Sequence, residues 1–174
     1  MGYGQKNYLE ILGTSGYRIS QIGCFLTSFA ELSRRFGDDI TPLALNRAFT
    51  DRGIYLNGGD LYWAAITKFN PNIVVEKTGS GVPPHSNAIV KFTGVGNQWG
   101  THFCLVADAS KGLIIDAWDG VTKHWSVYGG PKQWATYRDL TPGAATPPRF
   151  IFELPEEVLE YNNVDTSIIN NEYW

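Results

Sequence analysis

The stretch GYRISQIGCFLTSFAELSRRFG, residues 16–37, begins as a loop rich in glycine and ends as an amphipathic helix. In its second half apolar side chains recur at intervals of three and four residues, at Phe25, Phe29, Leu32 and Phe36. This spacing places them on one face of a helix, and Gly37 predicts where that helix ends. Cys24 lies where the loop meets the helix, so the sequence predicts a cysteine at a helix start.

Two further helical patterns follow this helix. Thr41 is a typical N-cap residue in front of Pro42, and the pair predicts the start of a second helix. Residues 58–72, GGDLYWAAITKFNPN, repeat this plan, with Asp60 as the predicted N-cap and the helix end before Pro71. The first half of the chain is therefore predicted to be helical.

After residue 71 the pattern changes to short runs of β-forming residues separated by Gly, Pro, Asn or Ser. The runs are NIVVEKT (72–78), NAIVKFTGV (87–95), THFCLVADA (101–109), GLIIDAW (112–118), HWSVY (124–128) and RFIFELP (149–155). Such runs predict a mostly antiparallel sheet. Because the helices precede the strands, the predicted fold class is α+β.

The length of 174 residues, with 43% hydrophobic and 18% charged side chains, suits one well-packed domain. We assign residues 1–154 to this domain, with residues 140–148 as a loop inside it because a strand-like run follows. Residues 155–174 are acidic and rich in asparagine, and we expect them to form a C-terminal extension or linker.

Composition argues against several classes of partner. The net charge is −3 and the basic residues are scattered, so nucleic acid and anionic membranes are not expected partners. No apolar stretch approaches about 18 residues, and the start of the chain lacks the pattern of a secretion signal. We therefore expect a soluble protein, made in the cytoplasm without a signal peptide and without membrane insertion. Two cysteines and three histidines without metal-binding spacing predict no metal and no cofactor.

Cys24 is compatible with two roles. The unpaired N–H groups at a helix start stabilise a thiolate, which would make Cys24 a nucleophile. Cysteine is also among the most buried residue types, and Cys24 could be a small core residue in front of an apolar stripe. A nucleophile requires a histidine that shares its proton and an acceptor that orients this histidine.

His102 is the best candidate for this base. It begins the predicted strand 101–109 after a glycine-rich loop, which would leave its ring at the open edge of the sheet. His85 lies in a proline-rich loop, and His124 has no acidic residue on its own strand face, so both are weaker candidates. An ordinary strand-end histidine bonded to a carbonyl is the alternative for His102.

Strand parity then selects the acceptor. If residues 108–112 form a five-residue hairpin loop, the opposed pairs include Cys104 with Asp116 and Ala107 with Leu113. Even-numbered residues of both strands then share a face, and Asp116 lies diagonally across from His102. A two-residue turn would put Asp116 on the opposite face. Asp119 is the fallback acceptor, and Cys104 is expected to be a buried neighbour of His102.

These segments resemble the papain-like cysteine peptidases related to the bacteriocin-leader-processing peptidases, a group common in phage lysins and bacterial surface proteins. The motifs that carry the resemblance are Tyr3 with Gln5, Leu12 to Ser15, Gly23-Cys24 with Thr27-Ser28, His102 with Val106, and IIDAWDG at 114–120. The resemblance implies a papain-like fold, with the cysteine at a helix N-terminus packed on the sheet. It also implies a catalytic triad of Cys24, His102 and Asp116.

One position departs from this family. Its members place a glutamine six residues before the cysteine to stabilise the oxyanion, and this chain has Arg18 there. Gln21 or Gln5 could supply the donor, or backbone N–H groups alone could form the oxyanion hole. Gln21 and Ser20 are equally compatible with a helix cap.

The sequence thus predicts a cysteine peptidase or amidase without a cofactor. Trp99 and Trp118, close to His102 and Asp116, could line a groove for the substrate. The resemblance points to peptidoglycan as the substrate, as in phage or prophage lysins that act on the cell wall after release. A leader-processing peptidase, a transglutaminase-like acyl transferase and a catalytically inactive peptide-binding module are the alternatives.

Overall fold

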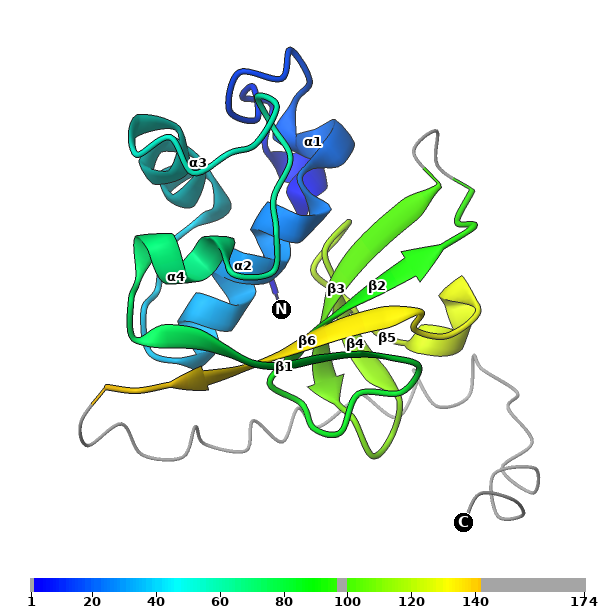
Figure 1. Cartoon of the computed structure of the whole chain (residues 1–174). Helices are drawn as coiled ribbons and strands as arrows, with labels where there is room; N and C mark the ends of the chain where they lie inside the picture. Colours follow the sequence, from blue (N-terminus) through cyan, green and yellow to red (C-terminus); the bar gives the residue numbers. More distant parts are fainter. Residues whose placement is uncertain (1, 97–99, 142–174) are drawn as a thin grey trace, which may run out of the picture. The chain divides into compact units, whose positions relative to one another are not determined.

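Helices occupy the first half of the chain and strands the second half (Figure 1). The computed structural model describes residues 2–96 and 100–141. The helices are η1 (Gln5–Asn7), α1 (Ile19–Ile22), α2 (Cys24–Arg35), α3 (Pro42–Asp51), α4 (Ala65–Phe69) and η2 (Trp125–Tyr128). The strands are β1 (Ile73–Ser80), β2 (Ala88–Thr93), β3 (Thr101–Asp108), β4 (Leu113–Asp116), β5 (Thr122–His124) and β6 (Gln133–Asp139). The predicted α+β class is confirmed.

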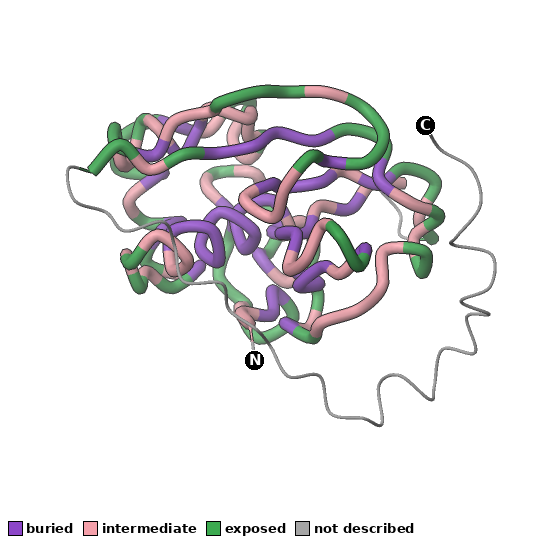
Figure 2. Tube along the Cα trace, turned by 90° about the horizontal axis from the view of Figure 1, so that it is seen from below, coloured by how far each residue is buried: buried purple, intermediate pink, exposed green. Residues whose placement is uncertain are grey.

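The six strands form one antiparallel sheet in the order β1-β6-β2-β3-β4-β5. Its odd-numbered side chains, such as Ile89 and Leu105, join the helices in the main core. Its even-numbered side chains, such as Val90 and Cys104, form a second buried cluster on the opposite face. Figure 2 shows these buried stretches inside the fold, with exposed residues at the turns. Both faces of the central strands are therefore buried.

Helix α2 begins at Cys24, as the periodicity predicts, and packs on β3 and α3. Residues 25–33 are buried on every side because α2 lies between the sheet and the other helices (Figure 1). The Phe25 ring stacks between Phe29, at 4.6 Å, and Phe103 of β3, at 4.2 Å between centroids. These contacts fix the first turn of α2 on the first residues of β3.

Helix α3 confirms the predicted capping. The Thr41 hydroxyl accepts a hydrogen bond from the Ala44 N–H at 3.2 Å, and Pro42 is the first helical residue. Such a cap satisfies one of the backbone donors that a helix start leaves unpaired.

The third predicted helix, from its cap at Asp60 to its end before Pro71, is wrong in its extent. Only Ala65–Phe69 is helical, and Asp60 does not cap it. Instead, Asp60 and Leu56 exchange backbone hydrogen bonds of 2.7 and 2.9 Å, which close a tight turn over the two glycines between them. Asp60 is thus held in this turn, and residues 61–64, which the sequence pattern assigns to the first part of the helix, are not helical.

Two strand predictions also differ from the structure. Of the run 124–128 only His124 belongs to a strand, and Trp125–Tyr128 form a 3-10 turn because His124 Nδ1 accepts from the Ser126 N–H. The pattern also misses β6, which lies between β1 and β2 and buries four consecutive residues, 134–137. A strand buried on both faces does not alternate between apolar and polar residues.

Several expectations concern residues outside the described part of the chain. These are the strand-like run 149–155, the domain boundary at 154, the extension 155–174, and most of the loop 140–148. Within residues 2–96 and 100–141, no helix has the length and apolar character that crossing a bilayer requires.

Candidate active site

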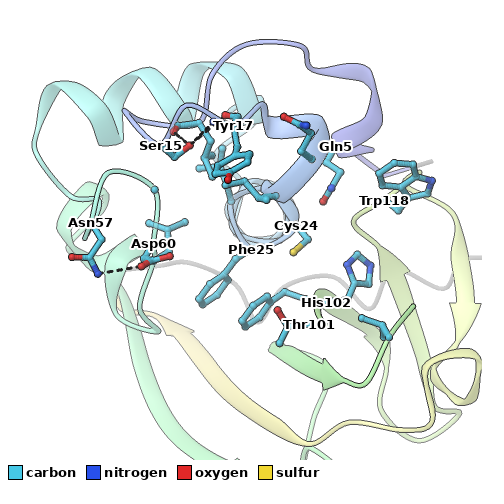
Figure 3. A pocket seen from close by; sticks show the side chains of 18 of the residues that line it. Gln5, Ser15, Tyr17, Cys24, Phe25, Asn57, Asp60, Thr101, His102 and Trp118 are labelled. Carbon is cyan, nitrogen blue, oxygen red and sulfur yellow. Dashed lines mark hydrogen bonds between the residues drawn. The ribbon is translucent and has the colours of Figure 1, made fainter. Parts of the chain in front are cut away.

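Cys24 lies at the N-terminus of α2, directly after the buried Gly23. It is partly exposed and lines a pocket of about 700 Å³. Its neighbour Phe25 stacks on Phe103, the neighbour of His102, with the two rings nearly parallel. This aromatic contact brings Cys24 of α2 and His102 of β3 to the same end of the fold. Figure 3 shows the sulfur of Cys24 directed toward the imidazole of His102.

His102 and Asp116 are in direct contact. His102 Nε2 lies 2.7 Å from Asp116 Oδ1, and both side chains are buried. Because Asp116 binds Nε2 of the ring, Nδ1 is the ring nitrogen that is available to Cys24. The predicted pairing of Cys104 with Asp116 is confirmed, and with it the shared face of His102 and Asp116.

The hairpin end of this pairing differs from the prediction. Asp108, and not Ala107, pairs with Leu113, because the register shifts by one residue between Val106 and Asp108. The loop therefore has four residues, 109–112, and a β-bulge takes up the extra residue. The parity of Asp116 is unaffected because the bulge lies on the loop side of it.

Asp116 receives hydrogen bonds on both carboxylate oxygens. The Trp118 N–H donates to Oδ1 at 2.9 Å, in addition to His102. Lys123 Nζ and the Tyr128 hydroxyl each donate to Oδ2 at 2.6 Å. The thiol of Cys104 lies 3.9 Å from Oδ1. This fully buried carboxylate is thus held by donors from β3, β5, η2 and its own loop.

Sequence reasoning missed Lys123 and Tyr128. Lys123 pairs with Ile114 across β4 and β5, so it shares the even-numbered face with Asp116. The parity argument that selects Asp116 would have found Lys123 if β5 had been placed at 122–124. Tyr128 reaches Asp116 from a 3-10 turn, for which the sequence pattern gives no comparable signal.

Burial and hydrogen bonding act against each other in this pair. Burial alone would raise the pKa of Asp116, but the hydrogen bonds from His102, Lys123 and Tyr128 hold this pKa well below its usual range. Burial alone would lower the pKa of His102, yet its contacts with Asp116, Cys104 and Cys24 raise it above its ordinary value. Burial raises the pKa of Cys104, which therefore remains a neutral thiol. The pair favours an imidazolium next to a carboxylate.

The two glutamines differ in how they are used. Gln21 is exposed, and its Oε1 accepts from the Arg18 N–H at 2.8 Å at the start of α1, as expected of a capping residue. Both glutamines line the pocket, but Gln5 is buried, and its Nε2 donates to the Ser20 carbonyl at 3.3 Å. Gln5 Oε1 is buried without a hydrogen-bond partner among the described residues. Unsatisfied buried polar atoms are uncommon in proteins, and Thr27 Oγ1 and Ser33 Oγ of α2 are two further examples among the described residues.

The position of Gln5 is fixed by the loop that follows Asp116. Its backbone N–H donates to the Ala117 carbonyl at 2.7 Å, and the Gly2 N–H donates to the Gly120 carbonyl at 2.8 Å. A Cβ atom at Gly4 would lie 2.7 Å from the Asp119 backbone, so only glycine allows this close approach. The first residues of the chain are therefore part of the site.

Aromatic side chains line the pocket. Trp118 lies exposed at one side of the pocket, and Tyr17, in the segment before α1, also lines it (Figure 3). The other predicted groove residue, Trp99, lies outside the described residues. The pocket thus offers ring faces as well as the thiol and imidazole to a ligand.

The other histidines lie apart from the pocket. His85 Nε2 is 3.2 Å from Glu76 on the surface, and His124 Nδ1 bonds to Ser126. Three side chains of metal-binding types, those of His102, Cys104 and Asp116, have ligand atoms within 4.8 Å of one another. Since His102 Nε2 and Asp116 Oδ1 are at hydrogen-bond distance, these two atoms would have to separate to bind an ion between them. In the described structure, His102 and Asp116 are therefore joined by a hydrogen bond and are not arranged around an ion.

The arrangement can support nucleophilic chemistry in principle. It combines a partly exposed thiol at a helix start, an imidazole beside it, and a buried carboxylate on the far side of the ring. Comparison with known proteins adds no assignment, because no family model, no curated protein and no solved structure matches this chain.

Proposed function

We propose that this protein is a cysteine hydrolase that cleaves a peptide or amide bond. The observation that carries the proposal is the position of the His102 ring, with Asp116 at 2.7 Å from Nε2 and Cys24 near the other side of the ring. An imidazole held in this way can take the proton of a thiol and later return it to a leaving amine. The partly exposed Cys24 and the adjoining pocket support a substrate approach from solvent.

The proposed reaction has two steps. The Cys24 thiolate attacks the carbonyl carbon, and the His102 imidazolium gives its proton to the leaving amine, which leaves a thioester on Cys24. Water then attacks the thioester, His102 takes one of its protons, and the acid product leaves, which restores the Cys24 thiolate and the His102 imidazolium. Asp116 orients the ring in both steps.

The proposed oxyanion contacts are the Cys24 N–H and the side chain of Gln5. One N–H of the Gln5 amide donates to Ser20, and the second is available for a substrate oxygen. Gln5 is favoured over Gln21 because it is buried in the pocket wall, whereas Gln21 caps α1. Loss of one such donor typically costs about 2.7–4 kcal/mol of barrier.

Selective alkylation tests the nucleophile. Iodoacetamide should modify Cys24 faster at neutral pH than it modifies a free thiol such as N-acetylcysteine, because His102 withdraws the proton. Peptide mapping should locate the label at Cys24 and not at the buried Cys104. His102→Gln should slow Cys24 to the rate of an unassisted thiol. A wild-type rate at or below the free thiol, unaffected by His102→Gln, would contradict the proposal.

Peptidoglycan is the substrate class that we propose to test first. It follows from the sequence resemblance, and the aromatic pocket walls are compatible with it. Purified cell walls should release new amino groups but no new reducing ends, and Cys24→Ala should abolish the release while keeping the fold. Release of reducing ends alone would exclude peptidase chemistry.

The same assay separates the alternatives. With an added primary amine, a transglutaminase-like acyl transferase would attach the amine to the acyl product, whereas a hydrolase forms the free acid. A leader-processing peptidase would cleave a leader peptide and leave cell walls intact. An inactive module would bind cell walls or peptides without turnover, and its Cys24 would show no dependence on His102.

A further inference from the structure

We propose that Lys123 is a positioning residue of this site, which offsets the negative charge of Asp116 and thereby limits how firmly His102 holds its proton. The inference rests on the proposed function, in which His102 must release that proton to the leaving amine. It adds a fourth side chain to the three that the sequence predicts.

The contacts divide the Asp116 carboxylate into two halves. Oδ1 faces the His102 ring and the Trp118 N–H, while Oδ2 faces Lys123 and Tyr128. Lys123 Nζ lies 2.6 Å from Oδ2, and only 29% of the Lys123 side chain is exposed to solvent. The ammonium group therefore acts on a carboxylate that is itself fully buried, where charges are weakly screened.

The Lys123 ammonium affects how easily the His102 imidazolium releases its proton. A buried carboxylate without a counter-charge stabilises the adjacent imidazolium strongly, and such an imidazolium is a poor acid at neutral pH. A cation on the second oxygen opposes this stabilisation without displacing the ring. His102 thus keeps its orientation from Oδ1 while its proton becomes easier to release.

The remaining groups around the pair do not replace Lys123. Tyr128 donates to the same oxygen but carries no charge, and Cys104 is a buried neutral thiol. Asp119 Oδ2 lies 2.9 Å from Lys123 Nζ, so it partly neutralises the ammonium. Cys24, on the far side of the ring, is the only other titratable group that the described residues bring to His102. Among these groups, Lys123 is the single permanent cation.

The test is the imidazole titration of His102, followed by NMR of nitrogen-15-labelled protein. Lys123→Met should move the titration of the His102 imidazolium to higher pH by about one unit, the shift expected for the loss of one nearby charge. Tyr128→Phe removes a hydrogen bond to the same oxygen without changing charge, and it should move the titration far less. Lys111→Met removes a lysine that pairs with the exposed Asp108, and it should move nothing.

Two further variants keep the test decisive. Lys123→Arg retains the cation and should restore the wild-type titration. Asp119→Asn frees Lys123 from its second carboxylate, so the titration should move to lower pH, and this result does not depend on the folding of Lys123→Met. Titrations of Lys123→Met and Asp119→Asn that match the wild type would overturn the inference.

Reactivity separates this inference from the proposed function. The titration is measured on the folded protein without substrate, so it reports the effect of Lys123 even if Cys24 proves unreactive. In an active protein, Lys123→Met should also move the alkaline limb of the pH profile of kcat/KM to higher pH, by the same amount as the His102 titration. Unassisted alkylation of wild-type Cys24 together with a shifted titration would refute the hydrolase and leave the charge coupling in place.

Discussion

Asp116 is the residue on which the polar contacts of the candidate site converge. Its carboxylate is fully buried and has donors on both oxygens. A buried charge is tolerated only where partners compensate the loss of solvent. The stability of this region therefore depends on the ionised form of one side chain.

At this scale we predict the effect of Asp116→Asn on stability. The variant should lower the free energy of unfolding by about 3–5 kcal/mol at pH 7, because it removes one partner of a buried ion pair. Urea unfolding measures this loss. Asp119→Asn is the matched control, since Asp119 is half-buried and also binds Lys123, and its loss should be much smaller.

The same prediction has a defined pH dependence. Folding lowers the pKa of Asp116 below its ordinary value of 3.8, so the ionised carboxylate stabilises the fold above that pH. The stabilisation is lost as the pH falls further through the folded-state pKa. The gap in stability between wild type and Asp116→Asn should therefore narrow in acid, and a gap that stays constant between pH 7 and pH 3 would contradict this account.

At the scale of elements, the site depends on how α2 packs on β3. Phe25 and Phe103 stack with ring centroids 4.2 Å apart, and their neighbours in sequence are Cys24 and His102. The stack is therefore the contact that sets the spacing between thiol and imidazole. The two polar residues come from elements far apart in the chain, and the packing of α2 on β3 brings them together.

We predict that Phe103→Leu separates stability from reactivity. Loss of the stacked pair should cost about 0.5–1.5 kcal/mol, because leucine keeps apolar volume but not the ring contact. The alkylation rate of Cys24 should fall more than this small loss suggests, since α2 and β3 can then shift. Phe49→Leu, on the buried face of α3, should cost similar stability without slowing alkylation. Equal alkylation rates in both variants would remove the stack from the site.

Elements also show how far sequence reasoning reaches. The helix at Cys24, the cap at Thr41 and the shared face of His102 and Asp116 follow from periodicity and parity. These properties are local, or need only one hairpin. Lys123 would follow from the same parity argument, but the sequence pattern places its strand at 124–128 instead of 122–124. Tyr128 and β6 depend on a 3-10 turn and on strand order, which arise from tertiary packing and leave no periodic signal in the sequence.

At the scale of the whole molecule, the pocket has an uneven charge distribution. Apart from Cys24 and His102, Asp60 is the only ionisable acid or base other than tyrosine among the described residues that line it. Its carboxylate bonds to the Asn57 amide at 3.2 Å, and the backbone pairing with Leu56 fixes the turn that carries it. Figure 3 shows Asp60 on the side of the pocket away from His102.

This distribution predicts a preference among substrates of the proposed hydrolase. A peptide with a lysine side chain that reaches Asp60 should be cleaved about two- to fivefold better than the matched norleucine peptide, as expected for one solvent-exposed ion pair. Asp60→Asn should remove the preference and leave cleavage of the norleucine peptide unchanged. Asp51→Asn on α3, outside the pocket lining, is the control. A preference for the lysine peptide that persists in Asp60→Asn would show that the lysine side chain does not pair with Asp60.

Residues 2–5 pack against the loop after Asp116, and this contact has a consequence for biosynthesis. Gln5 and Gly2 are translated before their backbone partners at Ala117 and Gly120, which follow more than a hundred positions later. The nascent chain must therefore keep its leading residues unattached while the helices form on the ribosome. Assembly of the thiol, imidazole and carboxylate must therefore wait until the residues up to Gly120 have left the ribosome, which would keep the proposed hydrolase inactive until that point.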